Sequence, residues 1–149
     1  MKRIYVNEKW CLGCRLCEYY CAFAETGKKN MALALKDVKI NPRIRVESHE
    51  DINFAVNCRH CDEPLCVKSC ITGALSVTDG VVKINSERCV ECYTCILVCP
   101  FGAIVPSDSG VLKKCELCLD IIEGSPACVK GCPNNAIVYE STLVQKGQG

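Results

Sequence analysis

The chain has 149 residues, enough for one small domain or two very small ones with a modest core. Its formal net charge of +1 provides no basic field, which argues against nucleic-acid binding. Sixteen residues are cysteines, so covalent or metal cross-links must supply part of the stability.

The cysteine content allows two structural explanations. Cysteine above about 8–10% of a short secreted chain usually indicates a disulfide scaffold. However, residues 1–10 show no apolar signal-peptide segment and no twin-arginine signal, and no stretch approaches the roughly 18 apolar residues of a membrane span. We therefore expect a cytoplasmic protein without a membrane span. In a reducing compartment, so many cysteines indicate bound metal.

The first predicted element is a short strand at residues 4–6, which leads into a group of four cysteines. This first group consists of Cys11, Cys14, Cys17 and Cys21. The same order recurs at residues 82–84, a second strand that leads into Cys89, Cys92, Cys95 and Cys99. Asn7 and Asn85 occupy matching positions before the first cysteine of each copy, so the chain contains an internal repeat.

Residues 26–51 contain no cysteine and are expected to form a hairpin insertion. Alternating polar and apolar residues on either side of Asn41-Pro42, over residues 37–40 and 43–47, predict its two strands. One interpretation is a solvated lid over the core. The alternative is a docking surface that uses the cations Lys36, Lys39, Arg43 and Arg45.

A second kind of cysteine group alternates with the first. Its two copies are Cys58, Cys61, Cys66, Cys70 and Cys115, Cys118, Cys128, Cys132. In both copies an insertion displaces the third cysteine, and both contain the sequence P-x-C-V-K-x-C. The four groups of four account for all sixteen cysteines.

The third group reads C-V-E-C-Y-T-C-I-L-V-C-P, a spacing typical of bacterial ferredoxins. Three cysteines at C-x2-C-x2-C can bind one iron–sulfur cube, while the fourth, turned away by the following proline, binds a second cube. Zinc usually takes two separated C-x2-C pairs, so this compact triplet suits it poorly. The alternative is a structural zinc protein, which metal analysis would distinguish from an iron–sulfur protein.

The connecting segments predict which groups share clusters, because in a two-cluster ferredoxin each group donates its last cysteine to the other group's cube. Asp79-Gly80, between apolar residues 74–78 and 81–84, is a strong hairpin signal that joins the second and third groups. We therefore expect an inner ferredoxin module at residues 52–106.

The first and fourth groups are left to pair with each other. Strand 4–6 can then lie beside strand 136–140, which gives an outer module of residues 1–25 plus 107–149. The inner module is nested inside it.

Four ligand sets follow from this exchange. The inner cubes are assigned to Cys58, Cys61, Cys66 with Cys99, and to Cys89, Cys92, Cys95 with Cys70. The outer cubes are assigned to Cys11, Cys14, Cys17 with Cys132, and to Cys115, Cys118, Cys128 with Cys21. Every iron then has a cysteine ligand, so we expect four [4Fe–4S] clusters and no catalytic residue.

The sequence also predicts the roles of several residues other than the cysteines. His60 could ligate iron, but its group already has four cysteines, so we expect a surface residue or a hydrogen-bond donor to sulfur. Gly73, Gly102 and Gly131 are expected at tight chain reversals. Residues 145–149 are expected to be frayed.

The four cysteine spacings, in this order, resemble the four-cluster ferredoxin-type electron-transfer subunits of molybdenum and tungsten oxidoreductases, of hydrogenases and of carbon monoxide dehydrogenase. The resemblance covers residues 3 to about 140. It implies an α+β fold of two pseudo-symmetric bacterial-ferredoxin-like modules, with short hairpins and helices wrapped round four clusters. It also implies a larger catalytic partner, of the tungsten aldehyde oxidoreductase or carbon monoxide dehydrogenase type, and a second electron carrier or flavoprotein as a further candidate.

The leading hypothesis is a non-catalytic subunit that relays single electrons to or from a larger redox enzyme. The alternative is a free, diffusible ferredoxin that serves several enzymes. A dedicated subunit buries an apolar contact patch, whereas a free ferredoxin is a stable acidic monomer.

Overall fold

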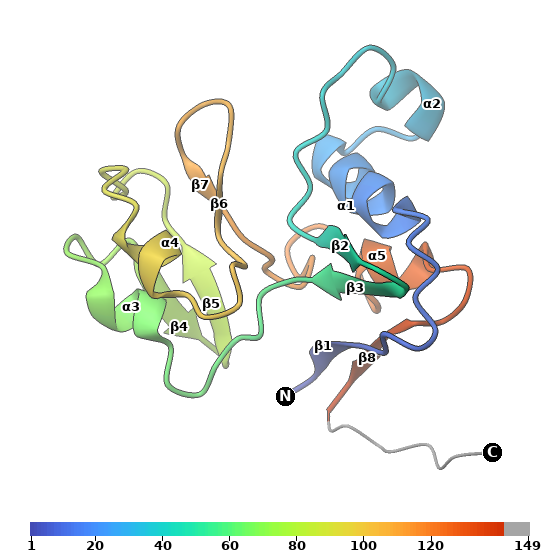
Figure 1. Ribbon diagram of the computed structural model, residues 1–149. Coiled ribbons are helices and arrows are strands. Elements are labelled where there is room, and N and C mark those ends of the chain that lie inside the picture. The colour runs from blue at the N-terminus through green and yellow to red at the C-terminus, as the bar shows by residue number, and fades with distance from the viewer. Residues whose placement is uncertain (142–149) are drawn as a thin grey trace.

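The computed structural model describes residues 1–141, which form two lobes (Figure 1). The elements in chain order are β1 (Arg3–Val6), α1 (Leu16–Thr26), α2 (Met31–Ala34), β2 (Arg45–His49), β3 (Ile52–Val56), α3 (Leu65–Ser69), β4 (Leu75–Thr78), β5 (Val81–Ile84), α4 (Thr94–Val98), β6 (Val105–Pro106), β7 (Leu112–Lys113), α5 (Ala127–Lys130) and β8 (Ile137–Glu140). The chain begins in the first lobe, crosses to the second between β3 and α3, and returns after β7. Residues 145–149, expected to be frayed, lie outside the described part of the chain.

The second lobe is built on the hairpin β4–β5, as the sequence predicts. The two strands pair antiparallel with Leu75 opposite Ile84. Asp79 and Gly80 connect them with φ values of 50° and 77°, and two successive positive φ values are what a type I′ turn requires. The helices α3 and α4 pack against each other beside this hairpin.

The first lobe joins the two ends of the described chain. β1 pairs antiparallel with β8, with Ile4 opposite Tyr139, which confirms the predicted pairing of these strands. The helices α1 and α5 contact each other in the same lobe. α1 ends at Gly27, whose left-handed φ of 63° is a common way to terminate a helix.

The predicted hairpin around Asn41-Pro42 is wrong. Residues 37–40 form no strand, and β2 instead pairs with β3 across a turn at Glu50 and Asp51. Proline lacks an N–H to donate to a strand partner, and β2 begins only after it. Glu50 adopts a left-handed φ of 52°, a conformation that the residue type does not favour and the sequence pattern did not reveal.

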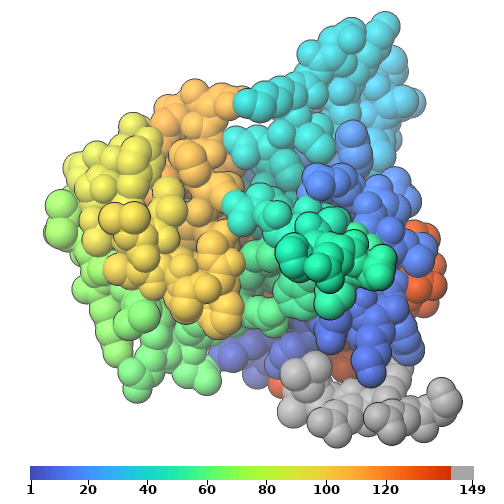
Figure 2. Space-filling model, viewed as in Figure 1, coloured from blue at the N-terminus to red at the C-terminus, as the bar shows by residue number. Residues whose placement is uncertain are grey.

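The sequence pattern also does not predict the short helix α2 in the insertion. Asn30 caps this helix, because its side-chain oxygen accepts a hydrogen bond from the Leu33 N–H at 3.1 Å. In Figure 2 the segment around α2 projects from the first lobe beyond the rest of the visible surface.

The packed interior is small and rich in cysteine. In the first lobe Ile4, Ile44 and Val46 pack with buried cysteines, which are Cys17, Cys21, Cys58, Cys115 and Cys128. In the second lobe Leu75 and Val82 pack round Cys95. The fold is therefore a small α+β fold of short helices and antiparallel strand pairs, compatible with a ferredoxin-like architecture. Among residues 1–141, no helix combines the length and apolar character that crossing a membrane requires.

Candidate metal centres

The first and third cysteine groups share one backbone conformation. Gly13 and Arg15 in the first group have φ values of 69° and 61°, and Glu91 and Tyr93 at the matching positions of the third have 57° and 59°. A left-handed conformation costs a non-glycine residue on the order of 1–3 kcal/mol. It reverses the chain between successive cysteines. The cysteine repeat was visible in the sequence, but these strained residues between the cysteines were not identified from it.

The three leading cysteines of the first group line a hollow in the first lobe together with the last cysteine of the fourth group. These cysteines are Cys11, Cys14, Cys17 and Cys132. Val46 and Ile137 contribute apolar walls, and the hollow encloses about 320 Å³, solvent-open space included. Cys14 is exposed, so this hollow reaches the protein surface.

A second hollow of the same kind lies in the second lobe. It is lined by three cysteines of the third group and the last cysteine of the second, which are Cys89, Cys92, Cys95 and Cys70. Leu75 and Leu112 contribute to its walls, and it encloses about 330 Å³ measured in the same way. Cys92 is exposed, so this hollow also reaches the surface.

The other cysteines of the second group lie near the last cysteine of the third. Burial raises the pKa of the Cys58 thiol, and the nearby charges of Cys61 and Cys99 raise it further. Burial also raises the pKa of Cys66, whose charged neighbours include Cys58 and Cys99. Cys99 therefore lies among the three leading cysteines of the second group.

The last cysteine of the first group lies among those of the fourth. Burial raises the pKa of Cys128 well above its usual value, and the charges of Cys115, Cys21 and Cys118 add to the rise. Burial raises the pKa of Cys21 to about 11, with Cys118 among its charged neighbours. α1, which carries Cys21, packs on α5, which carries Cys128.

Hydrogen bonds to sulfur oppose the effect of burial. The backbone N–H of Arg43 donates to Cys21 Sγ at 3.3 Å. At Cys70 burial raises the pKa, but hydrogen bonds from Leu75 and Thr72 outweigh it and lower the pKa to about 7. Such donors favour the thiolate, which is the form that binds metal.

The spread of the thiols distinguishes a cube from a single ion. Within residues 1–141, no three His, Cys, Asp or Glu side chains converge tightly enough to share one metal ion. Zinc needs its thiolates within about 2.3 Å of one centre. A cube binds each thiolate to a different iron, so its thiolates lie farther apart. All sixteen cysteines are free thiols, so none of them forms a disulfide, and each hollow is lined by four of them.

His60 is not the surface residue that the sequence suggested. Its side chain is completely buried, and its Nδ1 accepts a hydrogen bond from the Val82 N–H at 3.1 Å. Burial lowers the pKa of His60 to about 3, and the charges of Lys114 and Arg3 contribute. The neutral ring therefore carries its proton on Nε2, which has no partner among the described residues. Nδ1 lies 3.9 Å from Cys58 Sγ, whereas Nε2 is a buried donor that needs an acceptor which the described residues do not supply.

The three glycines have two different roles. Gly73 and Gly102 have φ values of 64° and 58°, which confirms the predicted chain reversals. Gly131 also lies in a turn, at the end of α5, but its ordinary φ of −86° does not require glycine. A Cβ at Gly131 would lie 2.4 Å from the ring of Tyr20, so glycine is required for the close contact of α5 with α1.

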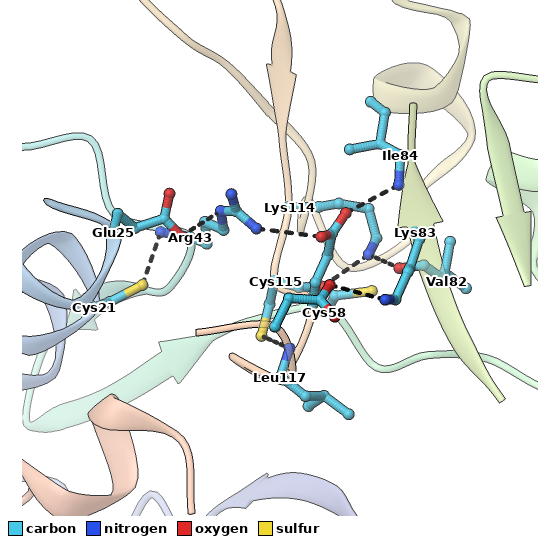
Figure 3. A network of polar contacts seen from close by, with 12 residues as sticks. Cys21, Glu25, Arg43, Cys58, Val82, Lys83, Ile84, Lys114, Cys115 and Leu117 are labelled. Carbon is cyan, nitrogen blue, oxygen red and sulfur yellow. Dashed lines mark hydrogen bonds and ion pairs between the residues drawn. The ribbon is translucent and has the colours of Figure 1, made fainter. Parts of the chain in front are cut away.

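Three cations of the insertion contact the chain itself, and one of them, Lys39, does so only on the surface, 3.5 Å from Asp108. Arg43 lies between two carboxylates, with Nε 2.7 Å from Glu25 Oε1 and Nη1 3.6 Å from Glu116 Oε2 (Figure 3). Arg45 Nη2 donates to the Gly102 carbonyl at 2.8 Å. The docking alternative for the insertion therefore loses two of the four cations on which it relied.

Comparison with known proteins finds relatives along almost the whole chain. A family model described as a 4Fe-4S dicluster domain matches residues 50–142. The chain is 37% identical over 150 residues to the iron-sulfur protein of Rhodospirillum rubrum, with 90% of this chain and 79% of that protein covered. It is 33% identical over 151 residues to the electron transport protein HydN of Escherichia coli K12, with 91% and 85% covered.

Two further matches are to a longer protein and to a chain of a solved complex. The chain is 36% identical over 152 residues to the putative oxidoreductase AegA of Escherichia coli K12, where 97% of this chain covers only 22% of that protein. It also resembles a chain in the solved structure of the active site complex BamBC of benzoyl coenzyme A reductase with benzoyl-CoA. That likeness has a TM-score of 0.51 at 25% identity, with 94% of this chain and 79% of that chain covered.

The fold, the cysteine repeats and the hollows define an iron–sulfur protein of the ferredoxin type, and its sixteen cysteines fit multiple [4Fe–4S] clusters. The chain belongs to the 4Fe-4S dicluster domain family and is a ferredoxin-type electron-transfer protein.

Proposed function

We propose that the sixteen cysteines hold four [4Fe–4S] clusters by exchange between groups. The ligand sets are Cys11, Cys14, Cys17 with Cys132; Cys58, Cys61, Cys66 with Cys99; Cys89, Cys92, Cys95 with Cys70; and Cys115, Cys118, Cys128 with Cys21. The two hollows support the sets that contain Cys132 and Cys70. The charged neighbours of Cys66 and Cys128 support the other two.

The same exchange divides the chain into two pseudo-symmetric modules. In this division the inner module spans residues 52–106 and is nested in the outer module of residues 1–25 plus 107–149, while residues 26–51 form the insertion. The lobes of the structure differ from these bounds, because β3 pairs with β2 of the insertion and β7 packs in the second lobe. The pairing of β1 with β8 supports the outer module, and the β4–β5 hairpin supports the inner one.

The function of these clusters is to relay single electrons. Four-iron clusters bound to four cysteines exchange one electron at a time and offer no iron position to a substrate, so the chain is a relay and not a catalyst. One observation carries this proposal: each lobe has a cysteine-lined hollow that reaches the surface, at Cys14 in one lobe and at Cys92 in the other. Electrons enter at one of these sites and leave at the other.

The relay requires a larger catalytic oxidoreductase subunit at one end. The tungsten aldehyde oxidoreductase and carbon monoxide dehydrogenase types are favoured by the resemblance of the cysteine spacings, and a second carrier or a flavoprotein serves the other end. The likeness to a chain of the BamBC active site complex supports a dedicated catalytic partner. So does the match to AegA, a much longer protein named as an oxidoreductase. The cytoplasm keeps thiols reduced and suits such a cysteine-rich chain.

Exposed apolar side chains surround both surface hollows and offer contact sites for partners. Leu12 lines the first hollow and is exposed, with exposed Trp10 nearby in sequence. Val90 lines the second hollow and is 60% exposed, and Ile71, next to the lining residue Cys70, is 75% exposed. Exposed apolar groups at the sites of electron exchange favour a docked subunit over a freely diffusing ferredoxin.

The experiment is anaerobic purification from native cell extract, followed by iron and sulfide analysis and identification of co-purifying chains. We expect about sixteen irons and equal sulfide per chain, with a stoichiometric large subunit that contains tungsten, molybdenum or nickel. Sixteen irons in a monomer without that subunit would instead support the free ferredoxin. About four metal ions without sulfide would support the zinc alternative.

Matched surface variants then locate the docking end. Leu12→Asp and Val90→Asp each place a charge beside one hollow, and Leu33→Asp on the exposed face of α2 is the control. We expect one of the two hollow variants to lose the catalytic subunit while all three retain their iron. Equal loss in the Leu33→Asp control would contradict docking at a cluster hollow.

A further inference from the structure

Lys114 is a completely buried cation at the junction of the two lobes. It follows β7, precedes Cys115 and is 0% exposed. Its Nζ donates hydrogen bonds to the carbonyl oxygen of Val82 on β5 and to that of Cys115, the latter at 2.7 Å (Figure 3). The ammonium is therefore held between a strand of the second lobe and a cysteine of the fourth group.

No carboxylate neutralises this charge within the part of the chain that the structure describes, residues 1–141. The other two cations in this network contrast with it, because Arg43 contacts the carboxylates of Glu25 and Glu116 and Lys83 contacts that of Asp120 at 2.8 Å (Figure 3). Burial of an ammonium is unfavourable unless a negative group lies close to it. The two carbonyl groups offer only dipoles, so a further negative group is needed.

The negative groups that face Lys114 are cysteines of two different ligand sets. Burial raises the pKa of Cys58, Cys66 and Cys115, and the charge of Lys114 opposes that rise at each. Cys58 and Cys66 belong to the set completed by Cys99, whereas Cys115 belongs to the set completed by Cys21. Lys114 therefore lies between two of the proposed clusters. A four-iron cluster with four thiolates carries a charge of roughly −2, which can balance the ammonium.

We propose that Lys114 raises the reduction potentials of the two clusters it lies between and so favours electron transfer across the lobe junction. Each one-electron reduction adds one negative charge, which the ammonium stabilises more strongly in the interior than it would in water. The electron comes from a neighbouring cluster or from the redox partner, which is oxidised by one electron. This inference rests on the ligand sets proposed above.

The two remaining ligand sets are expected to be insensitive to Lys114. The charged neighbours of Cys17 are Glu18, Cys11 and Cys14, and those of Cys95 are Cys70 and Cys89. These sets line the surface hollows, away from the junction. Removal of the Lys114 charge should therefore change the midpoint potentials of two clusters and leave those of the other two unchanged.

Three variants of the full chain test the proposal. Lys114→Met removes the charge and the hydrogen bonds, Lys114→Gln removes the charge but keeps an amide donor, and Lys114→Arg keeps the charge. Lys68→Met is the matched control, because Lys68 lies between Cys66 and Cys70 but is exposed and contacts Glu63 at 2.9 Å. Iron and sulfide are quantified first, and the four midpoint potentials are then measured by anaerobic redox titration monitored by electron paramagnetic resonance.

We expect Lys114→Met and Lys114→Gln to lower two of the four midpoint potentials and to leave the other two unchanged. Lys114→Arg and Lys68→Met should retain all four. Unchanged potentials in a fully loaded Lys114→Gln variant would overturn the inference, and so would an equal decrease of all four. If the wild-type protein contained fewer than about sixteen irons per chain, the ligand sets would be overturned as well.

A variant that fails to assemble its clusters also tests the proposal. Loss of the same two clusters from both uncharged variants, with retention in Lys114→Arg, would support the proposal because the charge would then be required to hold those clusters. Loss of clusters from all three variants would show that Lys114 acts through packing alone, which would overturn the inference.

Discussion

The backbone N–H of Val46 on β2 donates a hydrogen bond of 2.7 Å to the carboxylate of Glu18 on α1. Glu18 is buried beside Cys17, and its carboxylate also lies 3.5 Å from the guanidinium of Arg15. One acidic side chain thus connects the insertion hairpin to the helix that carries two cysteines of the first group.

Glu18→Ala should destabilise the first lobe because it leaves the Val46 N–H buried without an acceptor. We expect a loss of about 1–3 kcal/mol in the free energy of unfolding, measured by anaerobic guanidinium denaturation of the loaded protein. Glu18→Gln keeps a carbonyl acceptor and should lose less. A Gln variant that is less stable than the Ala variant would contradict this role.

Cys99→Ala should release the cluster that the leading cysteines of the second group hold, not the one held by its own group. We expect about four fewer irons per chain and new reactivity of Cys58, Cys61 and Cys66 toward iodoacetamide, located by mass spectrometry. Cys70→Ala is the matched control and should expose Cys89, Cys92 and Cys95. If each variant instead exposed the leading cysteines of its own group, the ligand exchange would be refuted.

Removal of the metal should unfold most of the chain. The packed interior consists largely of cysteines and small apolar residues, so without clusters it retains little that can stabilise it. Treatment with an iron chelator under reducing conditions is expected to abolish the far-ultraviolet circular dichroism of the folded protein. A native spectrum after complete iron loss would show that the protein core is sufficient.

Gly131→Ala should separate α5 from α1, because the new methyl group would overlap the ring of Tyr20. We expect a loss of about 1–3 kcal/mol in the free energy of unfolding, as for other overpacked sites. Ser69→Ala, at the same position of the repeat in α3, removes only a hydroxyl that contacts the Cys66 carbonyl and should cost less. Equal denaturation midpoints for the two variants would argue against the overlap.

The parts of the fold that the sequence predicts correctly depend on local chemistry. The β4–β5 turn follows from Asp79 and Gly80, which both tolerate positive φ, and the cysteine repeat follows from ligand spacing. The pairing of β1 with β8 was predicted by elimination, since the second and third groups were already joined. The ligand exchange itself stays a prediction.

The features that the sequence does not predict depend on packing between distant residues. His60 is buried because β5 passes over it, and nothing in the cysteine spacing indicates that contact. Lys114 precedes a cysteine much as other charged residues do, yet it is enclosed by Val82 and Cys115. Arg43 was assigned to a surface because Glu25 and Glu116 are distant in sequence. A single sequence contains no signal for such contacts.

The pairing of β1 with β8 has a consequence for synthesis of the chain on the ribosome. β1 is synthesised before every other described element, and β8 is synthesised after them. β1 therefore has no hydrogen-bonding partner during most of translation. The β4–β5 hairpin needs only its own turn and can close much earlier. The nascent chain can therefore complete its second lobe while the first is still open, and the cysteines that leave the ribosome first are among the last to be enclosed.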